Sequence, residues 1–277
     1  MAQNIQSTDD LLKAPQESKL IKNMRAIKNK IMVMSGKGGV GKSTVAANLA
    51  ARLADRGHKV GILDADIHGP SIPKMFGIED QKPTVDENGI VPVSVTENLV
   101  VMSVALLLPD RDAPVIWRGP AKMGAIKQFL EEVSWGKLDY LIIDLPPGTG
   151  DEPLSIAQLI EKVDGAVVVT TPQDVAIVSV RKSIKFAEIL EVPVIGIVEN
   201  MSGIICPHCD ERMELFGKGG VEQAAKDFNL KILGDLPLDP KLAEIEDSGK
   251  VHDIENEDIE WFKIFAKIVD SVESFNN

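Results

Sequence analysis

Short apolar runs rich in valine and isoleucine alternate with amphipathic stretches from Lys30 onward. Most of the runs are apolar almost throughout, which is typical of strands covered on both faces. Strands that alternate with helices imply right-handed crossovers between parallel neighbours. The pattern therefore predicts an α/β fold with a doubly wound, mostly parallel sheet. The predicted strands span residues 31–34, 60–63, 99–104, 140–143, 166–170, 194–198 and, more weakly, 231–234.

Amphipathic stretches between these runs predict the helices. Val45, Leu49 and Leu53 recur every four residues, and Gly57 follows at the point where this helix would end. Two further apolar stripes lie within residues 126–133 and 177–190.

The C-terminal segment, residues 259–272, is also amphipathic and has two interpretations. It carries Trp261, Phe262 and Phe265 on one broad face, which a membrane-targeting helix would insert into a bilayer. The acidic side chains within 255–260 oppose binding to anionic lipid. We therefore expect this helix to pack onto the sheet.

The chain is organised as a leader followed by one domain. Residues 1–28 are polar and mixed in charge, and we expect a leader that is mobile or loosely docked. Residues 29–277 then form one α/β domain. Its least regular parts, 66–98, 105–120 and 199–217, carry glycine or proline and are interpreted as long functional loops.

Charge and cysteine content narrow the class of protein. The 277-residue chain has 42 acidic and 30 basic residues, a formal net charge of −12, which disfavours nucleic-acid binding and stable membrane association. With two cysteines, a disulfide framework is excluded. The N-terminus lacks the apolar run of a signal peptide, and no apolar run of ~18 residues predicts a membrane span. We expect a cytoplasmic protein.

The sequence GKGGVGKST follows the first predicted strand and precedes the first predicted helix, as the phosphate-binding P-loop motif requires. Its glycines let backbone N–H groups turn inward around phosphate oxygens, and the helix N-terminus adds its positive dipole end. Lys42 would neutralise the β- and γ-phosphate oxygens, and the Ser43 hydroxyl can bind magnesium. The predicted ATP-binding residues of this loop are Gly36, Lys37, Gly38, Gly39, Val40, Gly41, Lys42, Ser43 and Thr44.

Three acidic residues at strand ends belong to the same chemistry. Asp64 and Asp66 follow the second predicted strand, at the carboxyl edge where ligands bind in open α/β sheets. Asp144 ends the apolar stretch LIID, which is typical of the strand that delivers a carboxylate to magnesium. We predict Ser43, Asp64 and Asp144 as magnesium residues and Asp66 as the residue that positions the attacking water.

Cys206 and Cys209 lie in the sequence CPHC, in a predicted loop near residues 203–210. Two thiolates three positions apart supply half of the four ligands that a tetrahedral or cluster site needs. A two-fold axis would bring the same loop from a second subunit and complete the set. Spacing alone leaves an iron-sulfur cluster, a four-cysteine zinc site, a redox pair and a pair of structural cysteines open.

Together these segments resemble the Mrp/ApbC family of P-loop ATPases that carry iron-sulfur clusters. The resemblance implies a homodimer that binds ATP and Mg²⁺ and holds one [4Fe-4S] cluster between its subunits through Cys206 and Cys209 of each. It also implies delivery of the cluster to apo iron-sulfur proteins, with scaffold proteins as further candidate partners. The chain resembles short members of the family, because no cysteine precedes Cys206. The motifs that carry the resemblance are GKGGVGKST (36–44), LDADIHGPS (63–71), WRGP (117–120), DLPPGTGDEPLS (144–155) and CPHC (206–209).

The resemblance extends to single residues. Lys37 follows the first glycine of the loop, as in the deviant P-loop of MinD-type ATPases, where the extra lysine reaches the partner's phosphates. Such a charge would stabilise the transferring phosphoryl group, so Lys37 joins Lys42 and Asp66 in the predicted catalytic set. Asn200 and Pro237 match residues that lie beside adenine in the MinD-type fold.

The sequence therefore predicts an ATP-hydrolysing carrier of iron-sulfur clusters. The alternative is a MinD/ParA-type positioning ATPase that acts on a membrane or nucleoid, which explains the P-loop and Lys37 equally well. That alternative gives CPHC no role, and the charge of −12 opposes both surfaces. An electron-transferring iron protein is a third interpretation. In such a protein the cluster cysteines lie in two separated loops, so the single CPHC sequence of this chain disfavours it.

Overall fold

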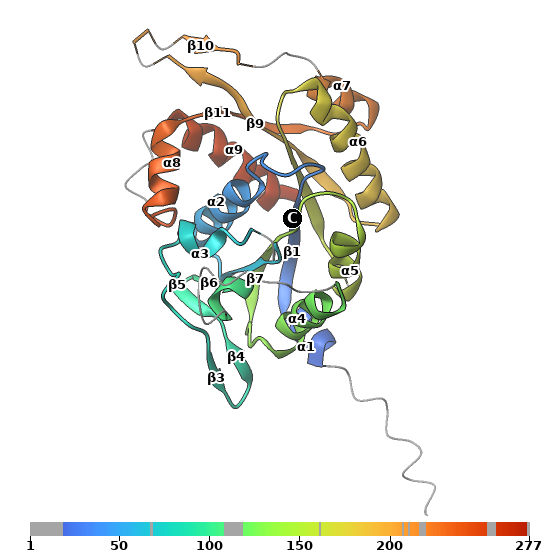
Figure 1. Ribbon diagram of the computed structural model, residues 1–277, viewed down its shortest axis with the longest axis vertical. Coiled ribbons are helices and arrows are strands. Elements are labelled where there is room, and N and C mark those ends of the chain that lie inside the picture. The colour runs from blue at the N-terminus through green and yellow to red at the C-terminus, as the bar shows by residue number, and fades with distance from the viewer. Residues whose placement is uncertain are drawn as a thin grey trace, which may run out of the picture.

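The computed structural model describes residues 19–66, 69–107, 119–160, 162–206, 208–209, 211–215, 220–253 and 259–275. They form one central sheet with helices on both faces (Figure 1). Paired strands of this sheet are parallel, except for the first pair and the last pair in the spatial order that follows. In spatial order the strands are β10 (Arg212–Met213), β9 (Val194–Ile205), β8 (Gly165–Thr170), β1 (Ile27–Met34), β7 (Leu138–Asp144), β2 (Val60–Asp64), β6 (Leu99–Ser103) and β5 (Val93–Thr96), and β11 (Ile232–Leu238) also pairs with β9.

Successive residues of the central strand β1 face opposite layers of helices. Ile31 and Val33 lie in one buried cluster, and Met32 and Met34 lie in another. This alternation explains why residues 31–34 are all apolar, since both faces of the strand are covered there. The first layer contains α2 (Lys42–Asp55), α3 (Ile72–Met75), α8 (Pro240–Asp247) and α9 (Glu260–Phe275). The second contains α1 (Lys19–Arg25), α4 (Gly119–Glu132), α5 (Asp151–Leu159), α6 (Asp174–Ile189) and α7 (Gly220–Asp227).

The predicted α/β class and each predicted strand are confirmed, but all three expected loops contain regular structure. The described residues within 105–120 belong to a 3₁₀ helix (Val104–Leu107) and to the start of α4. Residues 66–98 include α3, β5 and a separate hairpin of β3 (Thr84–Asp86) and β4 (Gly89–Val91). Residues 199–205 continue β9. The strand extends because β11 and β10 pair with its last residues, a long-range arrangement that local composition does not reveal.

The folded part of the chain begins before residue 28, where the expected leader was to end. Residues 19–28 form α1 and the first residues of β1, and residues 1–18 lie outside the described part of the chain. Met24 and Ile27 are buried in the cluster that also contains residues of α4. These two apolar side chains dock a segment whose other residues are mostly polar, which is why its composition suggested a leader.

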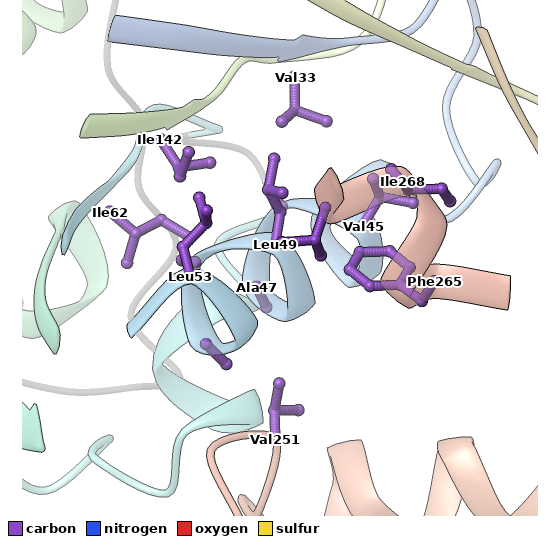
Figure 2. Close-up of a cluster of buried hydrophobic side chains, with 14 of the residues drawn as sticks. Val33, Val45, Ala47, Leu49, Leu53, Ile62, Ile142, Val251, Phe265 and Ile268 are labelled. Carbon is purple, nitrogen blue, oxygen red and sulfur yellow. The ribbon is translucent and has the colours of Figure 1, made fainter. Parts of the chain in front are cut away.

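The C-terminal helix α9 packs on the sheet, as expected. Its Trp261 and Phe265 are fully buried and stack with ring centroids 4.6 Å apart. Figure 2 shows Phe265 and Ile268 beside Val45 and Leu49 of α2, in the cluster beneath the sheet. The apolar face of α9 is therefore part of the core. Across the described residues, none of the helices combines the length and apolarity needed to cross a bilayer.

Candidate functional site

The P-loop connects the end of β1 to the start of α2, at the edge of the sheet where the parallel strands end. Lys37, Gly38 and Gly39 are exposed, whereas Val40 is buried. Gly41 has a φ of 80°, and a Cβ atom there would lie 2.0 Å from Asn200 Nδ2. Both the left-handed backbone and the close approach of Asn200 therefore require glycine at this position.

Lys42 is the centre of a buried charge cluster. Its Nζ lies 2.6 Å from Asp144 Oδ1 and 3.8 Å from Asp66 Oδ2, and its side chain is 6% exposed. The Ser43 hydroxyl donates to the other oxygen of Asp144 at 2.6 Å. The P-loop and the end of β7 are thus connected by both oxygens of one carboxylate.

Asp64 and Asp144 lie side by side because β2 and β7 are neighbouring strands in register at these residues. Both carboxylates are 1% exposed. Ser103, at the end of β6, donates its hydroxyl to Asp64 Oδ2 at 2.9 Å. Sequence analysis missed Ser103, although a polar residue at the carboxyl end of a predicted apolar strand was an available signal.

Burial of these carboxylates changes their protonation. Loss of hydration raises the pKa of Asp64 to about 8, and the neighbouring Asp144 adds to this, while Ser103 and Lys42 oppose it. Burial also raises the pKa of Asp144, against the opposing effects of Lys42 and Ser43. Lys42 is thus the one cation described beside the carboxyl groups of Asp64, Asp66 and Asp144.

Asn200 connects the loop to the strands on the other side of β1. It is buried on β9, and its Nδ2 donates to the carbonyl of Val40 at 3.0 Å. Pro237 lies on β11, immediately after Leu236, the register partner of Asn200. Both residues that the resemblance assigned to adenine therefore lie on adjacent strands, and Asn200 contacts the P-loop.

A second contact to the P-loop comes from α8 and was not foreseen. The carboxyl group of Glu246 lies beside the side chain of Thr44, the last residue of the motif. Burial raises the pKa of Glu246 to about 7, with a further increase from Asp247 and opposition from Thr44. Glu246 lies on the amphipathic helix α8, far along the chain from the P-loop, so no local pattern predicts this contact.

The two cysteines are not part of this charge cluster. Cys206 follows β9 directly, where its N–H donates to the carbonyl of Glu211 at 2.9 Å, and Cys209 is exposed. Neither is in a disulfide. They therefore lie in the loop that connects β9 to β10, and of the loop expected near 203–210 residues 203–205 belong to β9 instead. Within the described residues, no group of three or more His, Cys, Asp or Glu side chains is arranged to hold a metal ion.

The cysteine hairpin and the P-loop are joined by one strand. Asn200 and Cys206 are six positions apart along β9, which an extended chain spans in at most about 20 Å. Pro207, between the cysteines, lies outside the described residues, as do Trp117 and Arg118 of the motif WRGP.

Comparison with known sequences places these features in context. A family model described as ParA, the NUBPL iron-transfer P-loop NTPase, matches residues 26–273. A Methanocaldococcus jannaschii protein named iron-sulfur cluster carrier protein is 52% identical over 95% of this chain and 91% of its own length. A Yarrowia lipolytica protein named cytosolic Fe-S cluster assembly factor is 47% identical, over 92% of this chain and 90% of its own.

Comparison with solved structures agrees. A nucleotide-binding protein from Archaeoglobus fulgidus in complex with ADP is 44% identical, with a TM-score of 0.78 over 89% of this chain and 96% of its own. The cell division ATPase MinD of Pyrococcus furiosus is 23% identical, with a TM-score of 0.64 over 89% of this chain and 98% of its own. The second likeness concerns the fold alone.

Proposed function

The chain belongs to the ParA family of NUBPL-type iron-transfer P-loop NTPases, and from this premise we propose that it is an ATP-hydrolysing carrier of iron-sulfur clusters. The observation that carries the proposal is that β9 connects the two halves of the chemistry. Asn200 on this strand contacts the P-loop, and Cys206 follows its last residue. The relatives named iron-sulfur cluster carrier protein support the same cargo.

The P-loop half of the proposal is ATP binding. The backbone N–H groups of residues 36–44 would surround the phosphates, and Lys42 would neutralise the β- and γ-phosphate oxygens. Asn200 and Pro237 would lie beside adenine. The Archaeoglobus relative, a nucleotide-binding protein in complex with ADP, supports nucleotide binding by this chain.

Magnesium fits the oxygen groups beside the P-loop. The Ser43 hydroxyl and an Asp144 oxygen already lie 2.6 Å apart, and the buried Asp64 carboxylate is their neighbour. Hard oxygen donors of this kind suit Mg²⁺. When bound, the ion would neutralise charge that develops on the phosphate oxygens.

Two residues are proposed to act on the reacting phosphate. Asp66, whose side chain is 14% exposed and 3.8 Å from Lys42 Nζ, would orient the attacking water. Lys37 is exposed on the same loop and is therefore accessible to a second subunit. In a homodimer it would stabilise charge on the transferring phosphoryl group of the partner.

The cysteine half of the proposal needs two copies of the chain. Cys206 and Cys209 supply two thiolates, and a two-fold axis would supply the other two ligands of a [4Fe-4S] cluster. A cluster bound at an exposed interface is open to attack by other thiolates, which suits a cargo delivered to apo iron-sulfur proteins. Hydrolysis would change the dimer geometry around the cysteines, and scaffold proteins are proposed as the source of the cluster. The cytosolic relative from Yarrowia supports action in the cytoplasm.

Anaerobic reconstitution with iron and sulfide tests the cargo. Wild type is expected to become brown and to hold about four iron and four sulfide per dimer, the content of one [4Fe-4S] cluster. Each iron of such a cluster takes about one cysteine thiolate. The Cys206→Ala/Cys209→Ala variant should hold none, and Met213→Ala, which changes an exposed side chain of the same hairpin, should match wild type. Equal iron and sulfide in wild type and the double variant would overturn the proposal. Colourless wild type that retains zinc would indicate a four-cysteine zinc site instead.

A further inference from the structure

The hairpin that carries the cysteines is held by few backbone contacts of its own. Two residue pairs connect β10 to β9, Arg212 with Ile205 and Met213 with Ile204. The described part of the hairpin projects from one end of the molecule (Figure 1). Side chains must therefore contribute to fixing the direction in which the two thiols point.

One side chain crosses the hairpin from edge to edge. Ile204 of β9 is paired with Met213 of β10 on one side and with Leu238 of β11 on the other, so β9 lies between β10 and β11. Arg212 comes from β10, yet its Nη2 donates to Asp235 Oδ1 of β11 at 2.6 Å. The guanidinium therefore reaches across β9.

Two residues of β9 allow the Arg212 side chain to cross this strand. Gly203 has a φ of 148°, and a Cβ there would lie 2.6 Å from the Met213 carbonyl oxygen and 3.5 Å from Arg212 Nε. Next to it, the buried Ser202 accepts a hydrogen bond from Arg212 Nη2 at 2.5 Å and donates its own proton to the Leu236 carbonyl at 2.9 Å. Arg212 thus hydrogen-bonds to one side chain on β9 and to one on β11.

We propose that Arg212 is a positioning residue for the cysteine pair. It fixes the hairpin to β9 and β11, and its partners Ser202 and Asp235 are each two residues from Asn200 and Pro237, respectively. The position of the thiols is thereby set by the same two strands that would contact the nucleotide. This inference rests on the proposed function, because it assigns the hairpin the task of presenting Cys206 and Cys209 to a cargo.

Amide hydrogen exchange on the iron-free full chain tests the positioning separately from the cargo. The reporter is the Cys206 N–H, which donates to the Glu211 carbonyl. Arg212→Met should exchange this proton about tenfold faster than wild type, because the hairpin opens locally more often. Arg212→Lys should fall between them, since one ammonium can still pair with Asp235. Asp235→Asn, which removes the acceptor charge from the other strand, should shift exchange in the same direction as Arg212→Met.

A matched control separates positioning from a general effect on the fold. The control is the ion pair of Arg181 with Asp227, whose side chains are 37% and 36% exposed. The Arg212 and Asp235 side chains are similarly exposed, at 38% and 47%. Arg181→Met should leave Cys206 exchange unchanged, and both arginine variants should keep the wild-type melting temperature. Unchanged exchange of the Cys206 amide in Arg212→Met would overturn the positioning role, as would faster exchange with a matching fall in melting temperature.

Iron and sulfide uptake completes the test. Arg212→Met should take up less iron than wild type and Arg181→Met, with Arg212→Lys between them. Faster exchange together with full iron uptake would also overturn the role, because the thiols would then need no positioning. A wild type that takes up no iron would contradict the proposed function instead, and the exchange result would still decide whether Arg212 holds the hairpin.

Discussion

The P-loop edge and the cysteine hairpin, the two regions that would have to cooperate, are built in different ways. At the P-loop edge, Lys42, Asp64 and Asp144 are all less than 7% exposed, and each has a side-chain partner within 3 Å. In the hairpin, Met213 and Leu215 are 46% and 48% exposed, and Cys209 is at the surface. Buried charges are held in place before any ligand arrives, whereas the thiols are arranged by a small number of surface contacts. One site is therefore largely preorganised within a single chain, whereas the other is suited to completion by a second chain.

The largest effect is expected from Lys42→Ala, which tests whether the two regions work independently. The variant removes the charge 2.6 Å from Asp144, so ATP turnover should fall by about 10³-fold, as for loss of a group that stabilises a transition state. Iron and sulfide uptake should remain. The control is Lys59→Ala, on an exposed side chain that donates to the Glu97 carbonyl. Steady-state phosphate release measures both variants, and unchanged turnover in Lys42→Ala would remove the P-loop assignment.

A pair of alanine variants measures how differently the regions contribute to stability. Leu49 of α2 is fully buried behind the P-loop, so Leu49→Ala should lower the free energy of unfolding by about 2–5 kcal/mol. Met213→Ala, at a side chain 46% exposed in the hairpin, should change it by less than about 0.5 kcal/mol. Denaturant unfolding gives both values. Similar losses in the two variants would mean that the hairpin is part of the cooperative core.

Two glycine variants sharpen the same contrast locally. Alanine at Gly203 would meet the Met213 carbonyl at 2.6 Å in a backbone conformation that costs about 1–3 kcal/mol for other residues. Gly203→Ala should therefore speed exchange of the Cys206 amide while nucleotide affinity stays at the wild-type value. Gly41→Ala, which would clash with Asn200, should do the reverse. Isothermal titration with ADP and hydrogen exchange report the two effects, and a loss of both properties in either variant would contradict the separation.

The smallest effect, per pH unit, concerns Glu246, whose carboxyl group lies beside Thr44 of the P-loop. Because folding raises its pKa from 4.5 to about 7, the folded chain keeps a proton that the unfolded chain has released between these values. The stability that this proton provides is fully present below pH 4.5 and is lost as the pH rises through about 7. Glu246→Gln should flatten that part of the profile, by at most about 1.4 kcal/mol per pH unit. Urea unfolding at several pH values measures it, with Glu244→Gln, an exposed position of the same helix, as control. An unaltered slope in Glu246→Gln would exclude this group as its source.

Much of the nucleotide edge could be predicted from the sequence because its signals are local. GKGGVGKST lies between a strand and a helix, as the phosphate-binding motif requires. Asp64 and Asp144 could be placed at one edge because each ends a predicted strand, and parallel strands end together. The contact between Thr44 and Glu246 could not be predicted, because it depends on where α8 docks after more than 200 intervening residues.

The surroundings of the cysteines were the less predictable part. The spacing of Cys206 and Cys209 indicated half of a metal site, but the expected loop proved to be a strand extension and hairpin. That extension exists because β11 and β10 supply backbone partners to both edges of β9 at Ile204. The residue composition of 199–217 does not indicate which strands will pair with this segment.

The sequence alone determined the order of strands and helices, the phosphate loop, the acidic strand ends and the pair of thiols, because each depends on neighbours within a few residues. Tertiary structure decided which strands became adjacent, and adjacency sets both the partners and the burial of charged groups. Ser103 hydrogen-bonds to Asp64, and the two carboxylate oxygens of Asp144 accept from Lys42 and Ser43. The Arg212 side chain likewise reaches across β9 to Asp235. These contacts join residues that are distant along the chain, and only packing of the complete sheet brings them together.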